Sequence, residues 1–243
     1  MVQHVVQFSG GVGSAITALR VAEQYGTQDL TLLIADTRAE HPDLWRFSDD
    51  FAHLLGVELT VVRDGRDPWQ VFADQRFLGN NRLAHCTFIL KQKPCRAWMS
   101  KHAPPDDTIV YIGIEPNDRD RRRIPAIAHH WQPWRTEFPL ADGADATKDE
   151  LLDELRALGV RPPLLYELGF PHNNCYGSCV KAGQRQFKHL LATLPEQYAY
   201  VEAKEEELRE LLGPVAILRD RRGGTSRPLP LAELRAREQA AAA

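Results

Sequence analysis

The chain has 243 residues and a formal net charge of -3, with 43% hydrophobic and 26% charged residues. This mixture is typical of a globular protein with a sizeable core, and it excludes a protein that coats nucleic acid or anionic membrane by overall positive charge. No apolar run approaches the ~20 residues that a membrane-spanning helix needs, and the N-terminus lacks the pattern of a signal peptide. Composition therefore favours a cytoplasmic enzyme or binding protein with no membrane partner.

The first half of the chain alternates strand-like and helical segments. Short apolar runs at 4–8, 31–35, 59–62 and 108–113 predict strands, and helical spacing of apolar residues predicts helices that end before Gly26 and Gly56. Strands separated by helices imply right-handed βαβ units. We therefore expect an α/β fold over residues 1–164, with a doubly wound parallel sheet covered on both faces.

The second half is less regular. Residues 118–123 form a charged run, and the Trp- and Pro-rich residues 125–139 predict a loop. Thr147 and Glu150 have the spacing of a capping box, which predicts a helix to residue 158. Two more helices are predicted, followed by a turn and a fraying Ala-rich tail; the helices span 179–194 and 196–212. We expect residues 165–243 to be a helical extension that carries a cysteine pair and packs on the first domain.

A glycine-rich segment, Ser9-Gly10-Gly11-Val12-Gly13-Ser14, lies between the first predicted strand and helix. Glycines allow a tight turn, and N–H groups at a helix start suit a phosphate group. A Walker A loop needs a Lys after its last glycine, and none is present. A dinucleotide-binding loop needs a small residue where Ile16 stands, although Asp36 lies about the right distance downstream. A purely structural turn is the remaining alternative.

Other residues accompany this segment at characteristic places: Glu40 and Pro42 after the second strand, Cys86 with Lys91 and Pro94, Gly113 before an Arg cluster, and the run from Tyr166 to Cys179. Together they resemble the PP-loop ATP pyrophosphatase superfamily, and within it the phosphoadenosine-phosphosulfate-reductase-like branch. One departure is visible, because Gly13 stands where the motif usually has Asp. A magnesium ion would therefore rely on other ligands or on ATP oxygens.

The resemblance implies an adenine-nucleotide α-hydrolase-like fold that binds ATP and Mg²⁺ and cleaves between the α and β phosphates. It places adenine and ribose near Ile34, Ala35 and Asp36, although Asp36 could instead cap a turn. The hydroxyls of Ser9 and Ser14 can stabilise charge on departing pyrophosphate. The residues predicted to bind the nucleotide are Phe8, Ser9, Gly10, Gly11, Val12, Gly13, Ser14, Ala35, Asp36 and Gly113.

Two basic side chains complete the predicted catalytic set. Lys91 is a candidate phosphate contact, and Arg122 belongs to a cluster with Arg119, Arg121 and Arg123 that could grip an anionic substrate. A solvated charged loop is the alternative for this cluster. Trp131 and Trp134 follow it and could either stack on bases or pack in the core.

Four cysteines divide into a close pair and two single residues. Cys175 and Cys179 lie one helical turn apart if their segment is helical, or else Cys179 lies near a helix start, where a thiol pKa is lowered. Two cysteines are too few for a structural zinc site. The resemblance places a functional cysteine at Cys86, whereas Cys95 is predicted to be an ordinary core residue.

Three thiolates, those of Cys86, Cys175 and Cys179, could hold a [4Fe–4S] cluster with one iron left open, or one of them could carry persulfide sulfur. The neighbouring His85 and His172 could replace a ligand in a zinc or Rieske-like site. Simple burial of the three cysteines remains the alternative.

Within the resembled branch, the chain is most similar to the ATP pyrophosphatases of DNA phosphorothioation. This resemblance implies an enzyme that activates an acceptor for sulfur incorporation, with a cysteine desulfurase or another persulfide donor as partner and with DNA reached through partner proteins. The alternatives are a phosphoadenosine or adenosine phosphosulfate reductase, a tRNA thiolase, a dinucleotide oxidoreductase, and a zinc-containing nucleic-acid-binding module.

Overall fold

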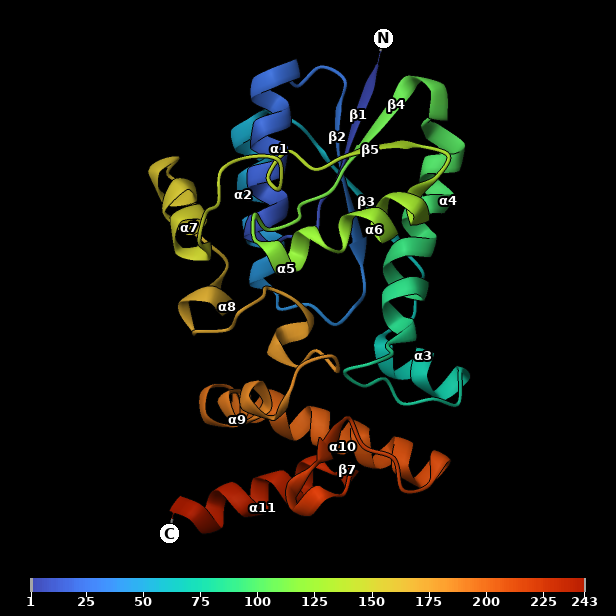
Figure 1. The fold of residues 1–243 in the computed structure, drawn as a ribbon, viewed down its shortest axis with the longest axis vertical. Helices are drawn as coiled ribbons and strands as arrows, with labels where there is room; N and C mark the ends of the chain where they lie inside the picture. Colours follow the sequence, from blue (N-terminus) through green and yellow to red (C-terminus); the bar gives the residue numbers. More distant parts are fainter. Residues whose placement is uncertain (1, 243) are drawn as a thin grey trace.

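A computed structural model describes residues 2–242. Its main sheet has five parallel strands in the order β3-β2-β1-β4-β5 (Figure 1). The chain leaves β1 toward β2 on one side and returns to β4 on the other, so the connections diverge at the carboxyl ends of β1 and β4. Ligands bind at such a point in open α/β sheets. The strands are β1 (Gln3–Gln7), β2 (Leu30–Asp36), β3 (Leu59–Arg63), β4 (Thr108–Tyr111) and β5 (Arg135–Glu137).

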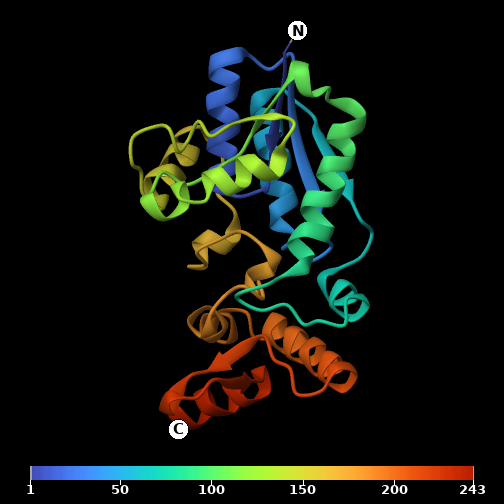
Figure 2. The same ribbon diagram turned by 45° about the vertical axis from the view of Figure 1, so that its right-hand side comes forward.

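Helices cover both faces of the sheet (Figures 1 and 2). Successive strand residues point to opposite faces, and β1 follows this rule. Val6 packs into a core with α1 (Val12–Tyr25), α2 (Asp43–Leu55) and α7 (Lys148–Ala157). Val5 packs into a second core with α4 (Lys93–His102) and the end of α6 (Ile124–Trp131). The predicted doubly wound parallel sheet is therefore confirmed.

The C-terminal part forms a separate layer below the carboxyl ends of the strands (Figures 1 and 2). Its core joins Phe187 and Tyr198 with Phe72 and Leu78, so residues of the first half contribute to it. The division at residue 164 stays a prediction. The remaining elements are α3 (Pro68–Asp74), η1 (Thr87–Gln92, a π-helical turn), η2 (Pro105–Asp107), α5 (Asp118–Arg121), α8 (Leu164–Glu167), η3 (Cys175–Gly177), α9 (Gln184–Thr193), α10 (Pro195–Leu212), β6 (Leu218–Asp220), η4 (Arg222–Gly224), β7 (Arg227–Leu229) and α11 (Leu231–Ala242).

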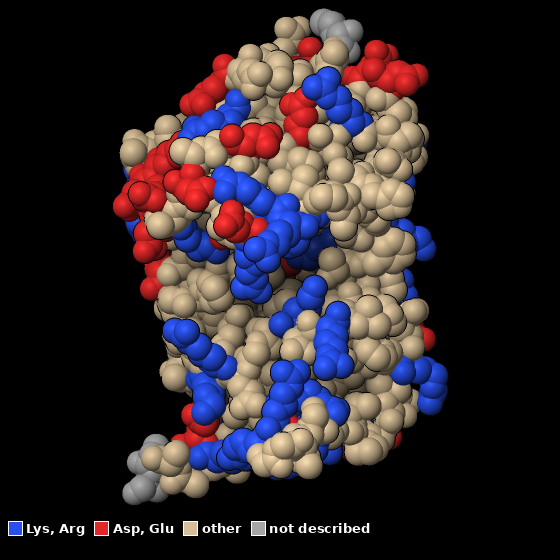
Figure 3. Space-filling model, in the orientation of Figure 1, with Lys and Arg blue, Asp and Glu red and all other residues tan. Residues whose placement is uncertain are grey.

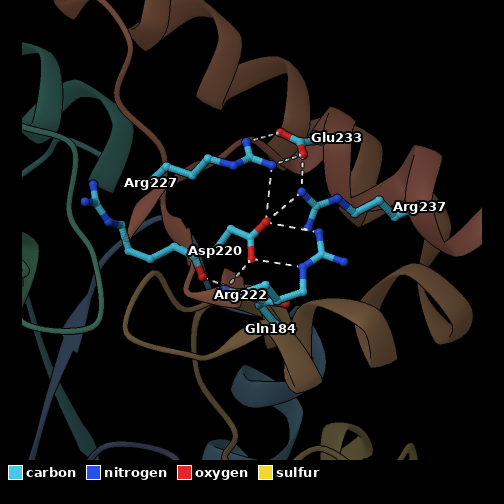
Figure 4. A network of polar contacts seen from close by, with 7 residues as sticks. Gln184, Asp220, Arg222, Arg227, Glu233 and Arg237 are labelled. Atoms are coloured by element: carbon cyan, nitrogen blue, oxygen red, sulfur yellow. Dashed lines mark hydrogen bonds and ion pairs between the residues drawn. The ribbon is translucent and has the colours of Figure 1, made fainter. Parts of the chain in front are cut away.

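Two buried carboxylates hold the end of the chain in place. Glu205 of α10 accepts backbone N–H bonds from Ile217 at 2.8 Å and Leu231 at 2.6 Å. Asp220 of β6 accepts hydrogen bonds from three arginine side chains, which Figure 4 shows. The donors are Arg222 at 3.0 Å, Arg227 at 3.2 Å and Arg237 at 2.8 Å. These bonds tie the hairpin β6–β7 and α11 to α10.

Three local predictions are wrong. Residues 125–139 are not a loop, because they contain most of α6 and all of β5; Pro125 is tolerated in the first turn of the helix. The helix expected from residue 179 begins at Gln184. The expected fraying tail is α11, whose Leu231 and Leu234 are buried in the C-terminal core. Within residues 2–242, every helix is too short or too polar to cross a membrane.

Candidate nucleotide and thiol site

The glycine segment forms a loop (loop 9–14) between β1 and α1 that is bent by its own residues. Gly10 has a φ of +70°, and a Cβ there would lie 2.7 Å from Leu44 Cγ. The Ser14 hydroxyl donates to the Gly11 carbonyl at 2.9 Å and accepts from the Ser9 N–H at 3.1 Å. Ser9 Oγ in turn donates to Ser14 Oγ at 3.2 Å. Ser14 therefore fastens the loop from inside, while Ser9 is exposed.

Distant residues hold the same loop from outside. The Asn173 amide donates to the Gly10 carbonyl at 2.7 Å, and Val12 N–H donates to Tyr166 Oη at 3.3 Å. These contacts join positions 163 and 154 residues apart in the chain. Tyr166 and Asn173 belong to the run of residues that carries the family resemblance, but the sequence alone assigns them no role. Periodicity and spacing carry no signal for contacts between residues so far apart in the chain.

A cavity of about 420 Å³, the loop cavity, lies at the carboxyl ends of β1, β2 and β4. Lys91 and Arg123 contribute cations to its wall. Gln7 Nε2 and Asn174 Oδ1 belong to lining residues, are buried, and have no hydrogen-bond partner within residues 2–242. Buried polar atoms are normally satisfied, so these two indicate a ligand. The predicted residues in its lining are Phe8, Ser9, Gly11, Gly13, Ser14, Ala35, Lys91 and Gly113.

Four predicted site residues lie outside this lining. The Gly10 carbonyl bonds Asn173, and Val12 is buried in the core. Asp36 accepts from the backbone N–H of Arg38 at 2.9 Å, which is the turn-forming role that the sequence left open. Arg122 is exposed at the C-terminal end of α5.

The rest of the arginine cluster is also divided among roles. Arg123 lines the loop cavity and pairs with Asp120 at 2.9 Å. Arg121 donates to the Ala141 carbonyl at 2.9 Å and so joins α5 to the segment that follows β5. Arg119 is exposed. The structure thus brings one of the four arginines to the cavity wall, and it is the neighbour of the one predicted.

The two tryptophans belong to the core beneath the sheet. Trp134 Nε1 donates to the Ala103 carbonyl at 2.7 Å, and both rings are 5% exposed. Trp131 also reaches the lining of the loop cavity. Core packing therefore accounts for Trp134, whereas the ring of Trp131 is both a core residue and part of the cavity wall.

A second cavity of about 220 Å³, the thiol cavity, is lined by Cys86, Cys175 and Cys179. Trp69 of α3 and Tyr200 of α10 form part of its wall. Cys95 is not in this lining. It is buried in the core and reaches the loop cavity, and burial raises the pKa of its thiol to about 12. The structure thus places Cys86, Cys175 and Cys179 around one cavity and Cys95 outside it.

The turn that carries the cysteine pair has an unusual backbone. Cys175, Tyr176 and Gly177 have consecutive positive φ values of 48°, 51° and 77°. Non-glycine residues in this conformation store strain and concentrate at functional sites. A Cβ at Gly177 would lie 2.6 Å from Phe170 Cε1, so only glycine fits there. The turn places the Cys175 thiol within hydrogen-bond distance of Cys179.

The electrostatics of the two thiols differ in sign. The hydrogen bond from Cys175 lowers the pKa of Cys179, and the nearby Lys91 ammonium lowers it further. The same hydrogen bond, together with burial and the Glu40 carboxylate, raises the pKa of Cys175. Burial also raises the pKa of Cys86. Cys179 is therefore the most acidic thiol of the group.

Glu40 connects the two cavities, because its side chain belongs to the wall of both and is only 4% exposed. It accepts from Lys91 Nζ at 3.0 Å, from Thr37 Oγ1 at 3.0 Å and from the backbone N–H of Cys175 at 2.5 Å. Burial alone would lower the pKa of Lys91, but Glu40 and the thiols outweigh it and the pKa is raised. Lys91 thus stays protonated. Glu40 is one of the residues that carry the family resemblance, but the sequence alone assigns it no role.

Three cysteines supply the sulfur atoms in the wall of the thiol cavity. Residues 2–242 contain no group of three Cys, His, Asp or Glu side chains close enough to hold one ion. Three thiols around one cavity suit a cluster, whose irons bind separate cysteines. His172 lines the loop cavity, and His85 lies outside both linings with its Nδ1 buried and unbonded among the described residues.

Comparison with known proteins bears on this arrangement. Among solved structures, the chain is similar to the U34-tRNA thiolase NcsA from Methanococcus maripaludis with its [4Fe-4S] cluster, at 16% identity and a TM-score of 0.51, covering 86% of this chain and 73% of that one. It is also similar to phosphoadenylyl-sulfate (PAPS) reductase from Candida auris in its phosphate complex, at 14% identity and a TM-score of 0.46, covering 70% and 80%. At these identities the likeness concerns the fold. No curated protein matches the chain.

The family comparison reaches further than the fold. The model of the phosphoadenosine phosphosulfate reductase domain matches residues 3–179, which span the sheet, loop 9–14 and all four cysteines. That range is well over half of the 243 residues. The chain therefore belongs to the phosphoadenosine phosphosulfate reductase domain family, within the PP-loop ATP pyrophosphatase superfamily.

Proposed function

We propose that this chain is an AMP-forming ATP pyrophosphatase that activates an acceptor for sulfur incorporation, with DNA phosphorothioation as its pathway. The observation that carries the proposal is the wall shared by the two cavities. Glu40 lines both, and it bonds Lys91 on the loop side and the Cys175 backbone on the thiol side. An activated phosphate and a reactive sulfur would therefore be formed next to each other.

ATP fits the loop cavity with its base against β2 and its phosphates at loop 9–14. Leu33, Ile34 and Ala35 supply an apolar wall at the strand end. The loop and the start of α1 supply N–H groups and the positive end of a helix dipole. Lys91 and Arg123 supply cations. Because position 13 has no carboxylate, Mg²⁺ would be held chiefly by ATP oxygens, and it would neutralise phosphate charge.

The first step is an in-line displacement at the α-phosphorus. An oxygen of the acceptor forms a bond to phosphorus, and the bond to the oxygen that bridges the α and β phosphates breaks. The electron pair leaves on pyrophosphate, whose charge the loop N–H groups and Mg²⁺ stabilise. The product is an adenylated acceptor. Attack by sulfur on that acceptor then releases AMP, and attack by water on the α-phosphorus in place of the acceptor gives AMP and pyrophosphate directly.

The thiol cavity would deliver the sulfur. Cys179 is the nucleophilic thiolate, because Cys175 and Lys91 lower its pKa. It can accept the outer sulfur of a persulfide on a cysteine desulfurase or another donor protein, whose own cysteine then leaves as a thiolate. Once that sulfur has bonded to the acceptor, the Cys175 thiol can attack Cys179 Sγ, so that the acceptor keeps the sulfur and a Cys175–Cys179 disulfide forms. If Cys86, Cys175 and Cys179 hold a [4Fe–4S] cluster, that cluster would supply an iron with one coordination position free for sulfur. In both cases Glu40 and Lys91 position the cysteine turn beside the nucleotide.

One observation also favours a reductase of adenylylated sulfate, the activity for which the family is named. Cys175 and Cys179 line the same cavity, and each thiol shifts the pKa of the other. Oxidation of two such thiols to a disulfide would release the two electrons and two protons that convert a sulfate group into sulfite. This reaction needs no cleavage between the α and β phosphates, so the products distinguish it from the pyrophosphatase.

Product analysis tests the proposal. Protein purified without oxygen, with its iron, sulfide and zinc quantified, is incubated with ATP and Mg²⁺ in the presence of duplex DNA or tRNA. With a persulfide donor present, we expect equal amounts of AMP and pyrophosphate and a strong loss of both in Ser14→Ala. Cys179→Ser should still release pyrophosphate and adenylate the acceptor, but it should incorporate no sulfur. Sulfite from adenylylated sulfate with no AMP from ATP would establish the reductase instead. Thionucleosides in tRNA would replace DNA as the acceptor.

A further inference from the structure

A third hollow, here named the arginine groove, lies in the C-terminal layer away from both cavities. It has a volume of about 580 Å³ and is formed by the loop after α3 together with the end of α10 and the hairpin β6–β7. Four arginines line it, and Asn80 and Ser226 add polar groups. The four are Arg76, Arg82, Arg219 and Arg221. Residues 211–228 of its wall lie beyond the family match, which ends at 179.

The charges in the groove are not balanced. Its lining contains no Asp or Glu. Arg219 donates to the hydroxyl and the carbonyl of Ser226, at 3.3 and 2.9 Å. Within residues 2–242, no carboxylate pairs with Arg76, Arg82 or Arg221, and all three are exposed. Four like charges therefore converge without a counter-ion from the described chain.

The neighbouring arginines give a direct contrast. Arg222, Arg227 and Arg237 surround Asp220 and Glu233 in the network of Figure 4, so their charges are neutralised within the fold. Arg221 and Arg222 are adjacent in sequence, yet Arg222 belongs to the network and Arg221 to the groove. The unbalanced charge is thus a property of the groove rather than of an arginine-rich segment.

Charge is also segregated on the face of the molecule that Figure 3 shows. The net charge is -3, but acidic side chains gather around α7, while Lys and Arg predominate around α5 and again over the C-terminal layer on the face in Figure 3. Local positive charge on a protein of negative net charge attracts a polyanion only at that place. Guanidinium groups match phosphate oxygens in geometry as well as in charge.

The arginine groove and the thiol cavity have one helix in common. Tyr200 of the thiol cavity and Leu211 of the groove lie on the same helix, α10. Their separation along the helix is about 16 Å at a rise of 1.5 Å per residue. The groove and the thiol cavity are therefore walled by two turns of the same helix.

We propose that the arginine groove binds the phosphodiester backbone of duplex DNA and so positions the acceptor. The choice of DNA rests on the proposed function, whereas the recognition of a phosphate backbone rests on the groove alone. Several arginines from separate elements along an open groove suit successive phosphates rather than one small anion. Contacts of this kind position a duplex without reading its sequence.

Fluorescence anisotropy with a labelled 30-bp duplex, without ATP, tests the proposal. Each lost phosphate contact reduces the slope of log affinity against log salt by about 0.9. We expect Arg82→Ala/Arg221→Ala to weaken binding for every sequence and to reduce the slope by about 2. Arg82→Lys/Arg221→Lys should keep most of the slope. The control Arg222→Ala removes one positive charge from the neighbouring network, next to Arg221 in the chain, and should bind the duplex as the wild type does.

The outcomes separate this proposal from the proposed function. Ser14→Ala should bind the duplex normally, and the groove variant should form AMP at the wild-type rate when no DNA is present. Equal binding by the groove variant and the wild type would overturn the groove assignment. So would an equal loss in Arg222→Ala. Tighter binding of a matched RNA duplex or tRNA than of DNA would overturn the choice of DNA. If the wild type formed no AMP from ATP, the proposed function would fail, but the measured binding of the duplex to the groove would still stand.

Discussion

Gly113, at the end of β4, packs backbone to backbone against Gly13 of loop 9–14. A Cβ on Gly113 would lie 2.7 Å from the carbonyl carbon and oxygen of Gly13 and 2.8 Å from the nitrogen of Ser14. Such distances do not occur between real atoms, so the loop would have to move. The contact follows from the sheet order, because β1 and β4 are parallel neighbours and their carboxyl ends meet.

Gly113→Ala is therefore expected to displace loop 9–14 and to reduce AMP formation by about 100-fold, the cost of a misplacement of about 1 Å in an active site. Gly13→Ala should lose far less, since a Cβ at Gly13 meets its neighbours at ordinary contact distances of 3.9 Å. Steady-state rates and nucleotide affinity measure both. Equal activity of Gly113→Ala and the wild type would mean that the loop does not hold the phosphates.

Cys179 is expected to react at a lower pH than an ordinary thiol. Its pKa is lowered by the hydrogen bond from Cys175 and by Lys91, so the thiolate persists below the usual value of about 8.5. Its alkylation rate should remain high at neutral pH and fall only when the pH drops through the lowered pKa. Iodoacetamide labelling of metal-free protein, read by peptide mass spectrometry, measures this. Cys95 is the internal control, because burial raises its pKa.

The two charges beside Cys179 should shift its titration in opposite directions. Lys91 favours the thiolate and Glu40 disfavours it. Lys91→Gln should therefore move the midpoint of alkylation upward, and Glu40→Gln should move it downward, each by roughly one pH unit. The same labelling experiment measures both variants. Shifts of the same sign would show that the variants disturb the cysteine turn rather than its electrostatics.

Glu205→Ala is expected to destabilise the C-terminal layer. The change leaves the buried N–H groups of Ile217 and Leu231 without acceptors, and each costs about 1–3 kcal/mol. The free energy of unfolding should fall by roughly 2–5 kcal/mol in urea titrations. Glu206→Ala is the matched control, since Glu206 is exposed and pairs only with Arg209 of its own helix. A similar loss in both variants would show that the two hydrogen bonds to Glu205 do not hold the C-terminal layer in place.

Local patterns were sufficient wherever the controlling interactions lie close together in the chain. The buried strands, α1 and α2, and the capping box of Thr147 and Glu150 follow from side chains a few residues apart. The segment that contains α6 and β5 was predicted to be a loop, because it is rich in Trp and Pro. Its actual fold depends on the packing of Trp131 and Trp134 in the core on one face of the sheet. The end of the chain misled for a similar reason, since α11 has no apolar face along its length and is held by the burial of Leu231 and Leu234 in the C-terminal core.

For the site, the sequence by itself determined the chemical groups: a phosphate-type loop, a cysteine pair with a third cysteine, and a lysine between them. Only the tertiary structure decided which groups meet. Glu40 lies between the two cavities, and Arg123 rather than Arg122 lines the loop cavity. Asp36 accepts a hydrogen bond from the backbone N–H of Arg38 instead of lining that cavity. The physical reason is that residue types and short-range spacing encode which bonds a group can make, whereas the partner it finds depends on contacts between residues up to 163 positions apart.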